Sequence, residues 1–465
     1  MQSPREILTD VWTGAAGDPA ALDAVTLSGE EPQLPSSFRV AAAAQVSIAA
    51  SGLAAAEIWQ QRSGETQTVS VDMRHAAIEC RSERYLRVAG KPPPPAWDAI
   101  AGVYRTGDGR FVRLHTNFPH HRAAVCEVLG CKAERNDVQA ALMKWQAEAF
   151  ETAAYASGGV VAMMRPFDEW SATPHAKALA QLPLISFEKI GEAAPKPWPK
   201  GGRPLAGIRV LDLSRVIAGP VAGRTLAAHG ADVMLISSPD LPAIPWLSID
   251  NGRGKLSSFV ELKREAGRAT MCELLATADI FSQGYRPRAL AALGLAPEDA
   301  AEINPGIVYV TLSAYGHAGP WAERRGFDSL VQTATGFNHA EGQAAGIDGP
   351  KELPAQMLDH ATGYLMAFGA MMAKARQARE GGSWHVQVSL AQTGRWLWNL
   401  GRLGDGLQTA DYPEDVVSPF LEELASGYGA LRSVRPSAVL SRTPAFWARP
   451  SMPLGSHPPQ WPTLD

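Results

Sequence analysis

The chain has 465 residues, of which 46% are hydrophobic and 19% are charged, and its formal net charge is −4. This is the composition of an ordinary globular protein, and the length predicts two or three domains. The small net charge, without a long run of one sign, argues against bulk binding to nucleic acid or to an anionic membrane surface.

The N-terminal segment predicts neither export nor a membrane anchor. Met1-Gln-Ser-Pro-Arg-Glu6 lacks a basic stretch followed by an apolar core, so we expect no signal peptide and a cytoplasmic protein. Residues 40–56 form an Ala-rich apolar stretch that is too short and too mild for a membrane span. We assign residues 1–90 to an N-terminal helical segment.

Two proline-rich joints bound a compact second piece. One is Lys-Pro-Pro-Pro-Pro at 91–95, and the stronger is the linker at 194–204, because proline fixes φ and lacks a backbone donor. Two alternating apolar runs around a Gly-Asp-Gly turn predict a hairpin over 102–115. Helical patterns follow over 119–129 and 138–158. We therefore expect a small α+β domain at 91–193.

After Pro204 the pattern alternates between strands and helices. Such alternation implies a parallel sheet with right-handed crossovers. The predicted fold class is α/β: a Rossmann-like open parallel sheet domain at 205–400 plus the smaller α+β domain, followed by a C-terminal return segment at 401–465. Apolar runs predict the strands at 208–213, 232–236, 257–261, 280–282 and 307–312.

A partial internal repeat links the N-terminal segment to the large domain. Residues 42–73 and 359–390 each read as an Ala-rich helix followed by a short alternating strand. At this ungapped offset Gly369 aligns with Gly52, and Val386 aligns with Val69. Asp359 aligns with Ala42, so the two copies are not chemically equivalent.

Three loops carry residues suited to an anionic ligand. The first leads from a strand into a helix N-terminus, whose free N–H groups favour an anion, but it lacks a GxGxxG or Walker pattern. The second is Gly-rich with two cations, and the third follows a strand end, where open α/β sheets bind ligands. Each loop is also explained as a structural turn or a solvated surface. The candidate residues are Ile217, Ala218, Gly219, Arg253, Lys255, Tyr285 and Arg286.

Asp359 is the carboxylate of most interest. It lies at the start of an apolar helix, where aspartate is often an N-cap, whereas a functional interpretation makes it a positioned nucleophile or base. Asp328 precedes a helical run that begins at Ser329, and we favour an N-cap role for it.

The spacing of cysteine and histidine gives no metal signature. The four cysteines form no CxxC pair, and only Cys126 and Cys131 are close in sequence. Together with His115, His120 and His121 they match no standard zinc pattern. We therefore expect free thiols in a reducing cytosol and no metal site.

Several weak motifs follow one another in a specific order between residues 204 and 388. This order resembles the class III CoA-transferase family, which also includes α-methylacyl-CoA racemase. The small-domain motifs also fit, but they precede the α/β domain, so the chain resembles a permuted member. The motifs are Pro204-Leu-Ala-Gly-Ile-Arg-Val-Leu-Asp-Leu213, Ala218-Gly-Pro220, Arg253-Gly-Lys255, Tyr285-Arg-Pro287, Asn304-Pro-Gly-Ile-Val-Tyr-Val310 and Phe327-Asp328.

The resemblance implies a reaction and its residues. The family aspartate, here Asp359, attacks an acyl-CoA thioester to give an aspartyl anhydride, and CoA then passes through an aspartyl-CoA thioester to a second carboxylic acid. The three loops above are expected to hold CoA, which is a substrate, and no tightly bound cofactor is needed. Racemase members carry a proton-transferring histidine where this chain has Phe327, so racemisation by that pairing is disfavoured.

The chain departs from the family at the end of the second predicted strand. Acidic and then basic residues that help to hold CoA are usual there, and this chain has Ser237-Ser238 instead. Arg215, Arg224, Arg324 and Arg325 are the cations that we consider as replacements.

We therefore predict an acyl-CoA:carboxylate CoA-transferase that acts on acyl-CoA and a small carboxylic acid. The resemblance implies a homodimer, and we expect no nucleic-acid or membrane partner. Two alternatives stay open. One is a 2-methylacyl-CoA racemase or isomerase that transfers an α-proton with Asp359 and either His360 or His317. The other is an inactive CoA-binding or scaffold protein.

Overall fold

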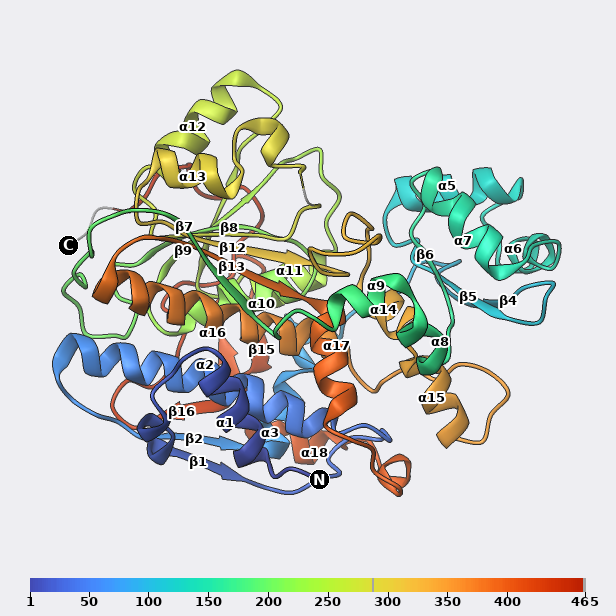
Figure 1. The fold of residues 1–465 in the computed structure, drawn as a ribbon, viewed down its shortest axis with the longest axis horizontal. Coiled ribbons are helices and arrows are strands. Elements are labelled where there is room, and N and C mark those ends of the chain that lie inside the picture. The colour runs from blue at the N-terminus through green and yellow to red at the C-terminus, as the bar shows by residue number, and fades with distance from the viewer. Residues whose placement is uncertain (287, 463–465) are drawn as a thin grey trace.

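A seven-stranded sheet forms the centre of the molecule (Figure 1). The computed structural model describes residues 1–286 and 288–462, so Pro287 of the third loop motif lies outside the described residues. The strands of this sheet are β7 (Ser186–Gly191), β8 (Arg209–Leu213), β9 (Asp232–Ser237), β10 (Lys255–Phe259), β11 (Ile280–Gln283), β12 (Val308–Ser313) and β13 (Ser383–Ser389).

The spatial order of the sheet is β10-β9-β8-β11-β12-β13-β7. The first six strands are parallel, and counted from β8 they follow the order 3-2-1-4-5-6 of doubly wound sheets. The order reverses between β8 and β11, and in such sheets a ligand binds in the crevice outside the carboxyl ends of the strands at that point.

The sheet is mixed and not purely parallel as predicted, because β7 is antiparallel to β13. β7 comes before the linker, within the segment 91–193 that we assigned to the small domain. Strand periodicity shows that a segment is extended, but it does not show which sheet the strand joins. The division into domains stays a prediction.

Helices cover both faces of the sheet because side chains alternate along each buried strand. Val210 and Val308 face one set of helices, and Leu211 and Tyr309 face the other set. Figure 1 shows the two sets on opposite sides of the sheet. The first set is α10 (Ala218–Ala228) and α16 (Met357–Glu380), and the second is α12 (Glu265–Leu275) and α13 (Pro297–Ile303).

The two copies of the sequence repeat form similar units whose first helices pack against each other. At the predicted offset, the paired helices begin at aligned residues and the paired strands end at aligned residues. A Cβ at Gly52 would lie 3.1 Å from Val69 Cγ1, and a Cβ at Gly369 would lie 2.8 Å from Val386 Cγ1, so each glycine lets its helix approach its strand. The units are α2 (Val40–Ser63), β2 (Val69–Asp72) and α3 (Met73–Glu79), and α16, β13 and α17 (Leu390–Asn399).

Helix α2 is a core helix of this structure. It is the one helix within the described residues that is long and apolar enough to cross a membrane, but 94% of its most apolar window is buried inside the protein.

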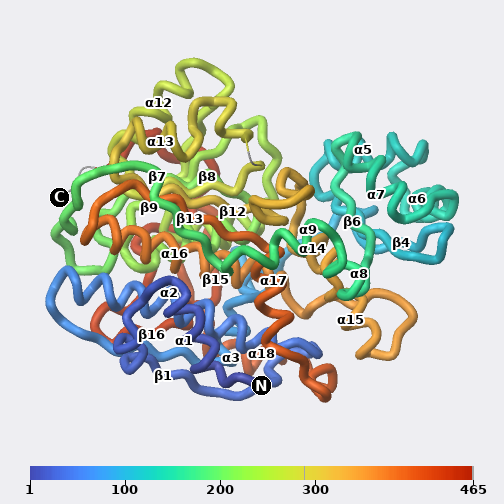
Figure 2. Tube along the Cα trace, in the orientation of Figure 1, coloured from blue at the N-terminus to red at the C-terminus, as the bar shows by residue number. Residues whose placement is uncertain are grey.

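The small α+β part forms a separate lobe at the right of Figure 2. Its hairpin is β4 (Gly102–Arg105) and β5 (Phe111–Leu114), and β6 (Val161–Met163) extends it. Helix α5 (Pro119–Leu129) has the predicted bounds. The single helix predicted over 138–158 is two helices, because the intervening Trp145 carbonyl accepts the Gly107 N–H of the hairpin turn at 2.9 Å. These helices are α6 (Arg135–Leu142) and α7 (Ala147–Ala156).

The C-terminal segment returns to the N-terminal segment and joins it in two small sheets, β1-β2-β16 and β14-β15-β3. Their remaining strands are β1 (Val25–Ser28), β3 (Arg87–Val88), β14 (Leu421–Leu424), β15 (Leu431–Val434) and β16 (Ala438–Leu440). The other α-helices are α1 (Pro4–Gly14), α4 (Ser82–Tyr85), α8 (Phe167–Ala172), α9 (Pro174–Leu179), α11 (Pro245–Asn251), α14 (Asp328–Ala334), α15 (Phe337–Ala344) and α18 (Glu414–Val417).

Candidate active site

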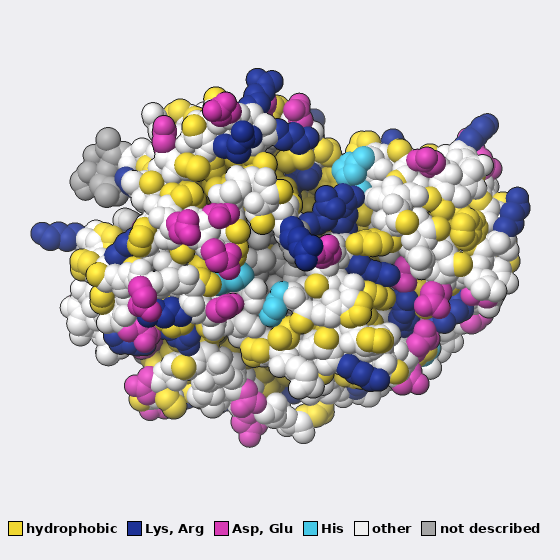
Figure 3. Space-filling view, turned by 45° about the horizontal axis from the view of Figure 1, so that its top comes forward, with side chains coloured by type: hydrophobic (Ala, Val, Ile, Leu, Met, Phe, Trp, Pro, Cys, Tyr) yellow, Lys and Arg dark blue, Asp and Glu magenta, His cyan; other side chains and the backbone are white. Residues whose placement is uncertain are grey.

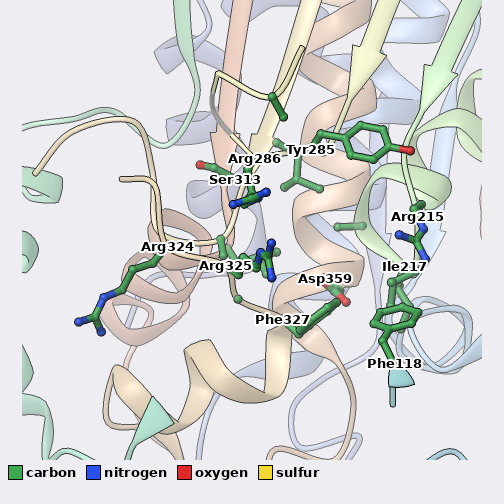
Figure 4. A pocket seen from close by; sticks show the side chains of 18 of the residues that line it. Phe118, Arg215, Ile217, Tyr285, Arg286, Ser313, Arg324, Arg325, Phe327 and Asp359 are labelled. Atoms are coloured by element: carbon green, nitrogen blue, oxygen red, sulfur yellow. The ribbon is translucent and has the colours of Figure 1, made fainter. Parts of the chain in front are cut away.

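A cavity of about 340 Å³ opens at the carboxyl ends of β8, β11 and β12, where the strand order reverses. Asp359 lines it from α16, and residues of the small lobe close its other side (Figure 4). A cavity of this size suits part of a small-molecule ligand. The cavity lies where the strand order reverses and contains the carboxyl of Asp359, and it is therefore the candidate active site.

Asp359 is the third residue of α16 and is 7% exposed. Its backbone N–H donates a hydrogen bond to Asp328 Oδ2 at 2.9 Å. Asp328 is the first residue of α14 and is fully buried, and its other oxygen accepts from the Gln332 amide. The prediction that Asp328 caps its own helix is therefore wrong: Phe327 is the N-cap of α14, and the Asp328 carboxylate caps the first turn of α16 instead.

The N-terminal copy of the repeat has a similar cap, but it has no carboxyl group at the third residue of its helix. Glu31 Oε1 accepts the backbone N–H of Ala42 at 2.7 Å, and Ala42 is the third residue of α2. The carboxyl cap is therefore present at both helix starts, whereas Asp359 has no counterpart at Ala42.

Burial makes both carboxyls of the Asp359–Asp328 pair less acidic. It raises the pKa of Asp328 to about 6, although hydrogen bonds from the Asp359 N–H and Gln332 act in the opposite direction. Burial, the neighbouring Asp328 and then Glu83 raise the pKa of Asp359 well above its ordinary value. Two carboxyls that share a buried site resist double ionisation, and the ionised Asp359 is a poorly solvated and correspondingly basic carboxylate.

The first βα loop faces Asp359 across the cavity. Ile217 and Ala218 line the cavity as predicted, and the first-turn N–H groups of α10 begin there. Gly219 does not line it, because a Cβ there would collide with Ser214. Val216 has φ 74°, a strained conformation for a β-branched residue, and such strain is concentrated at functional loops.

Cations and an aromatic ring surround the mouth of the cavity. Tyr285 and Arg286 line it as predicted, and Arg215 and Arg325 join them. Figure 4 shows Arg286 and Arg325 on the same side of the cavity as Asp359, whereas the Arg324 guanidinium points away. In Figure 3 Lys and Arg side chains gather beside the hollow between the two lobes. A second small cavity shares Arg215 and extends toward the end of β9.

Arg253 and Lys255 lie outside the cavity that contains Asp359, although Lys255 borders the second small cavity, and the pairing of both cations argues against the predicted contact with CoA. Both side chains are 1% exposed. Arg253 and Arg224 each pair with Asp250 at 2.6 Å, and Lys255 pairs with Asp212 at 2.7 Å. Both cations are paired with buried carboxylates inside the protein, so neither is free to bind a phosphate. A Gly-rich loop with two cations has the same sequence pattern whether the cations are exposed or paired.

The histidines proposed for proton transfer do not line the cavity, but two others do. His360 is buried with Nε2 3.0 Å from Glu83 Oε2, and neither it nor His317 borders the cavity. His120 and His121 of α5 line it instead. Sequence reasoning considered them only as metal ligands, and within residues 1–286 and 288–462 no group of three or more His, Cys, Asp and Glu side chains is placed to hold a metal ion.

Comparison with known proteins agrees with the motif order. The profile of CoA-transferase family III matches residues 19–190 and 205–415. An acyl-CoA transferase of Gibberella moniliformis is 28% identical over 81% of this chain and 74% of its own length. The human succinyl-CoA:glutarate CoA-transferase is 36% identical over 37% of this chain and 41% of its own length.

A solved structure gives a further match. The crystal structure of Rv3272 from M. tuberculosis is 32% identical, with a TM-score of 0.38, over 43% of this chain and 58% of that one. For the human and mycobacterial proteins, the chain therefore spans about half of the relative's length. The family profile, in contrast, covers most of the chain in two segments, and on that match the chain belongs to CoA-transferase family III.

Proposed function

We propose that this protein is an acyl-CoA:carboxylate CoA-transferase with Asp359 as its nucleophile. The observation that carries the proposal is the buried carboxyl of Asp359 at the start of a helix. It lines a cavity whose mouth is cationic, and the cavity lies where the strand order of the sheet reverses. The printed names of the relatives, an acyl-CoA transferase and a succinyl-CoA:glutarate CoA-transferase, support this reaction class.

The reaction needs no net proton transfer. The Asp359 carboxylate attacks the thioester carbon, the C–S bond breaks, and an aspartyl anhydride and CoA thiolate form. The thiolate attacks the Asp359 carbonyl carbon, which releases the first carboxylate and leaves an aspartyl-CoA thioester. A second carboxylate then repeats the two steps in reverse order and leaves with CoA. Burial and Asp328 raise the pKa of Asp359, so its ionised form is basic, and acylation requires that the carboxyl is first deprotonated.

The first turn of α10 supplies hydrogen-bond donors for these steps. The thioester oxygen gains negative charge as Asp359 attacks, and N–H groups fixed at a helix N-terminus stabilise such an oxyanion without reorganisation. Ile217 and Ala218 lie on the cavity wall where these groups begin. Arg215, Arg286 and Arg325 at the mouth suit the phosphates of CoA, and Tyr285 suits its adenine ring.

Trapping of the acyl-enzyme tests this function. The purified protein is incubated with acetyl-CoA or succinyl-CoA and hydroxylamine, and we expect free CoA and a hydroxamate at Asp359 by mass spectrometry. Asp359→Asn loses both. Asp348→Asn, which changes a carboxylate that is 90% exposed, keeps both. Wild-type protein that gives no Asp359 adduct with either donor contradicts the transferase function and leaves the racemase and the inactive CoA-binding protein as alternatives.

Two further measurements address the finer predictions. Incubation of 2-methylacyl-CoA in deuterated water without an acceptor acid separates transfer from racemisation, and exchange of the α-hydrogen contradicts transfer. The family resemblance supports a homodimer, for which light scattering gives twice the chain mass of 49.6 kDa.

A further inference from the structure

The small lobe places two adjacent histidines on the wall of the cavity that contains Asp359. His120 and His121 are in the first turn of α5, directly after Phe118 and the helix-starting Pro119. His121 is 4% exposed, and its ring centroid is 6.1 Å from that of Phe327, the residue before Asp328. The histidines therefore face the reacting carboxyl from the opposite lobe.

His121 has no internal partner that explains its burial. No hydrogen bond joins either ring nitrogen to another group in the described part of the chain, and Nδ1 is enclosed. Of the two ring nitrogens of His121, Nε2 is the one that is not enclosed, and the residue lines the cavity. A buried imidazole without a partner loses a hydrogen bond relative to water, and such groups in native proteins usually meet a ligand or water.

The charges around His121 favour an anion. Burial, the neighbouring imidazoles of His120 and His115, and the cations Arg325 and Arg215 lower the pKa of His121 to about 3, so its imidazole is neutral. A neutral imidazole presents one N–H donor, and no carboxylate within residues 1–286 and 288–462 accepts a hydrogen bond from the His121 ring. Arg215 and Arg325 add positive potential to the same cavity.

The proposed reaction requires a place for such an anion. The acceptor acid enters as a carboxylate and must stay near Asp359 despite the neighbouring acidic Asp328. The arginines lie at the mouth, where CoA phosphates would occupy them, so the acceptor needs donors deeper in the cavity. A histidine on the small lobe meets this requirement. Its neutral imidazole supplies an N–H donor and adds no positive charge to those of the arginines.

We propose that His121, with His120 beside it, binds the carboxylate group of the acceptor acid next to Asp359. The ring centroids of the two histidines are 4.1 Å apart, and both residues line the cavity, with His121 buried and His120 exposed. This assignment rests on the proposed transferase function and adds the subsite for its second substrate. His121 transfers no proton in this role, because the attacking group is already a carboxylate.

The experiment separates acylation of Asp359 from transfer to the acceptor. Acylation is followed with acyl-CoA and hydroxylamine alone, and transfer is followed as the KM of glutarate and of acetate with whichever of acetyl-CoA and succinyl-CoA acylates Asp359 faster. A hydrogen bond to a charged group contributes about 1.5–3 kcal/mol. His121→Phe therefore raises the acceptor KM about 10-fold or more, and it leaves the acylation rate within about 2-fold.

Amide variants keep the test valid if the Phe variant does not fold. Gln places its amide near the position of Nε2, so His121→Gln keeps the acceptor KM within about 3-fold, whereas the shorter His121→Asn raises it. His339→Gln, on α15 and outside the cavity, is the matched control.

An unchanged acceptor KM in both the Phe and Asn variants overturns the subsite. A parallel loss of acylation also overturns it, because His121 would then serve the first half-reaction. Failure of the wild-type protein to form the Asp359 adduct overturns the transferase function itself and the subsite with it.

Discussion

Gly363 controls how closely the first βα loop approaches Asp359. It is one turn after Asp359 on α16, and a Cβ there would lie 2.5 Å from the Ala218 carbonyl oxygen and 2.7 Å from Val221 Cβ. A carbon–oxygen contact is normally no shorter than about 3.3 Å, so Gly363→Ala must move the start of α10 by about 0.8 Å. The obstructing atoms are backbone and a helix Cβ, which cannot rotate away.

The change should weaken both stability and catalysis. Overpacking costs up to about 3 kcal/mol, and alanine returns about 1 kcal/mol of helix propensity, so we expect the free energy of unfolding to fall by about 2 kcal/mol. A displacement near 1 Å at reacting groups costs up to about 100-fold in rate, so acylation of Asp359 should slow by about 10- to 100-fold.

Urea unfolding and the hydroxamate assay measure the two effects. Gly14→Ala is the control, because a Cβ at the exposed end of α1 meets no atom within 4 Å, and it should leave both quantities unchanged or slightly raise stability. Wild-type stability together with wild-type acylation in Gly363→Ala would refute the close contact between α10 and α16.

Three other substitutions test the site. Asp328→Asn removes the charge beside Asp359 and should move the acidic limb of the acylation rate to lower pH; an unmoved limb contradicts the pairing. In the wild type, Asp328 binds its proton more tightly in the folded state than in the unfolded chain. The free energy of unfolding should therefore fall as the pH rises from about 4 to about 6. The Asn variant should lose the part of this fall that Asp328 causes, and the part that Asp359 causes should remain, in denaturation at several pH values. Arg325→Gln should raise the KM of acyl-CoA about 10-fold and weaken its salt dependence, and an unchanged KM removes Arg325 from the CoA site. Arg253→Met should lower the free energy of unfolding by about 3 kcal/mol with an unchanged KM, whereas a higher KM at normal stability would restore its predicted contact with CoA.

The local pattern of apolar residues was sufficient to predict the strands of the large domain. The five strands predicted after Pro204 are all present, with ends that differ by one or two residues, because buried parallel strands are continuous apolar runs between turn signals. No strand was predicted at β7, and its place in the large sheet left no local signal, because its partner β13 lies almost two hundred residues later.

The sequence predicted the residues of the candidate site that follow directly after a strand within one loop. Ile217, Ala218, Tyr285 and Arg286 follow strand ends, and the sheet brings all such ends to one edge. His121 was missed as a cavity residue because its proximity to Asp359 depends on how the small lobe packs. Arg253 and Lys255 were misplaced for the same reason, since only the tertiary structure shows that Asp250 and Asp212 neutralise them.

The Glu31–Ala42 pair separates the capping of a buried helix from any reaction at its start. A carboxylate caps the third residue of α2, although that residue is an alanine. Glu31 and Asp328 are not at aligned positions of the repeat, so two different segments of the chain supply the same kind of acceptor. A buried helix start needs such an acceptor for its free N–H groups, and Asp328 therefore serves the fold whether or not Asp359 reacts.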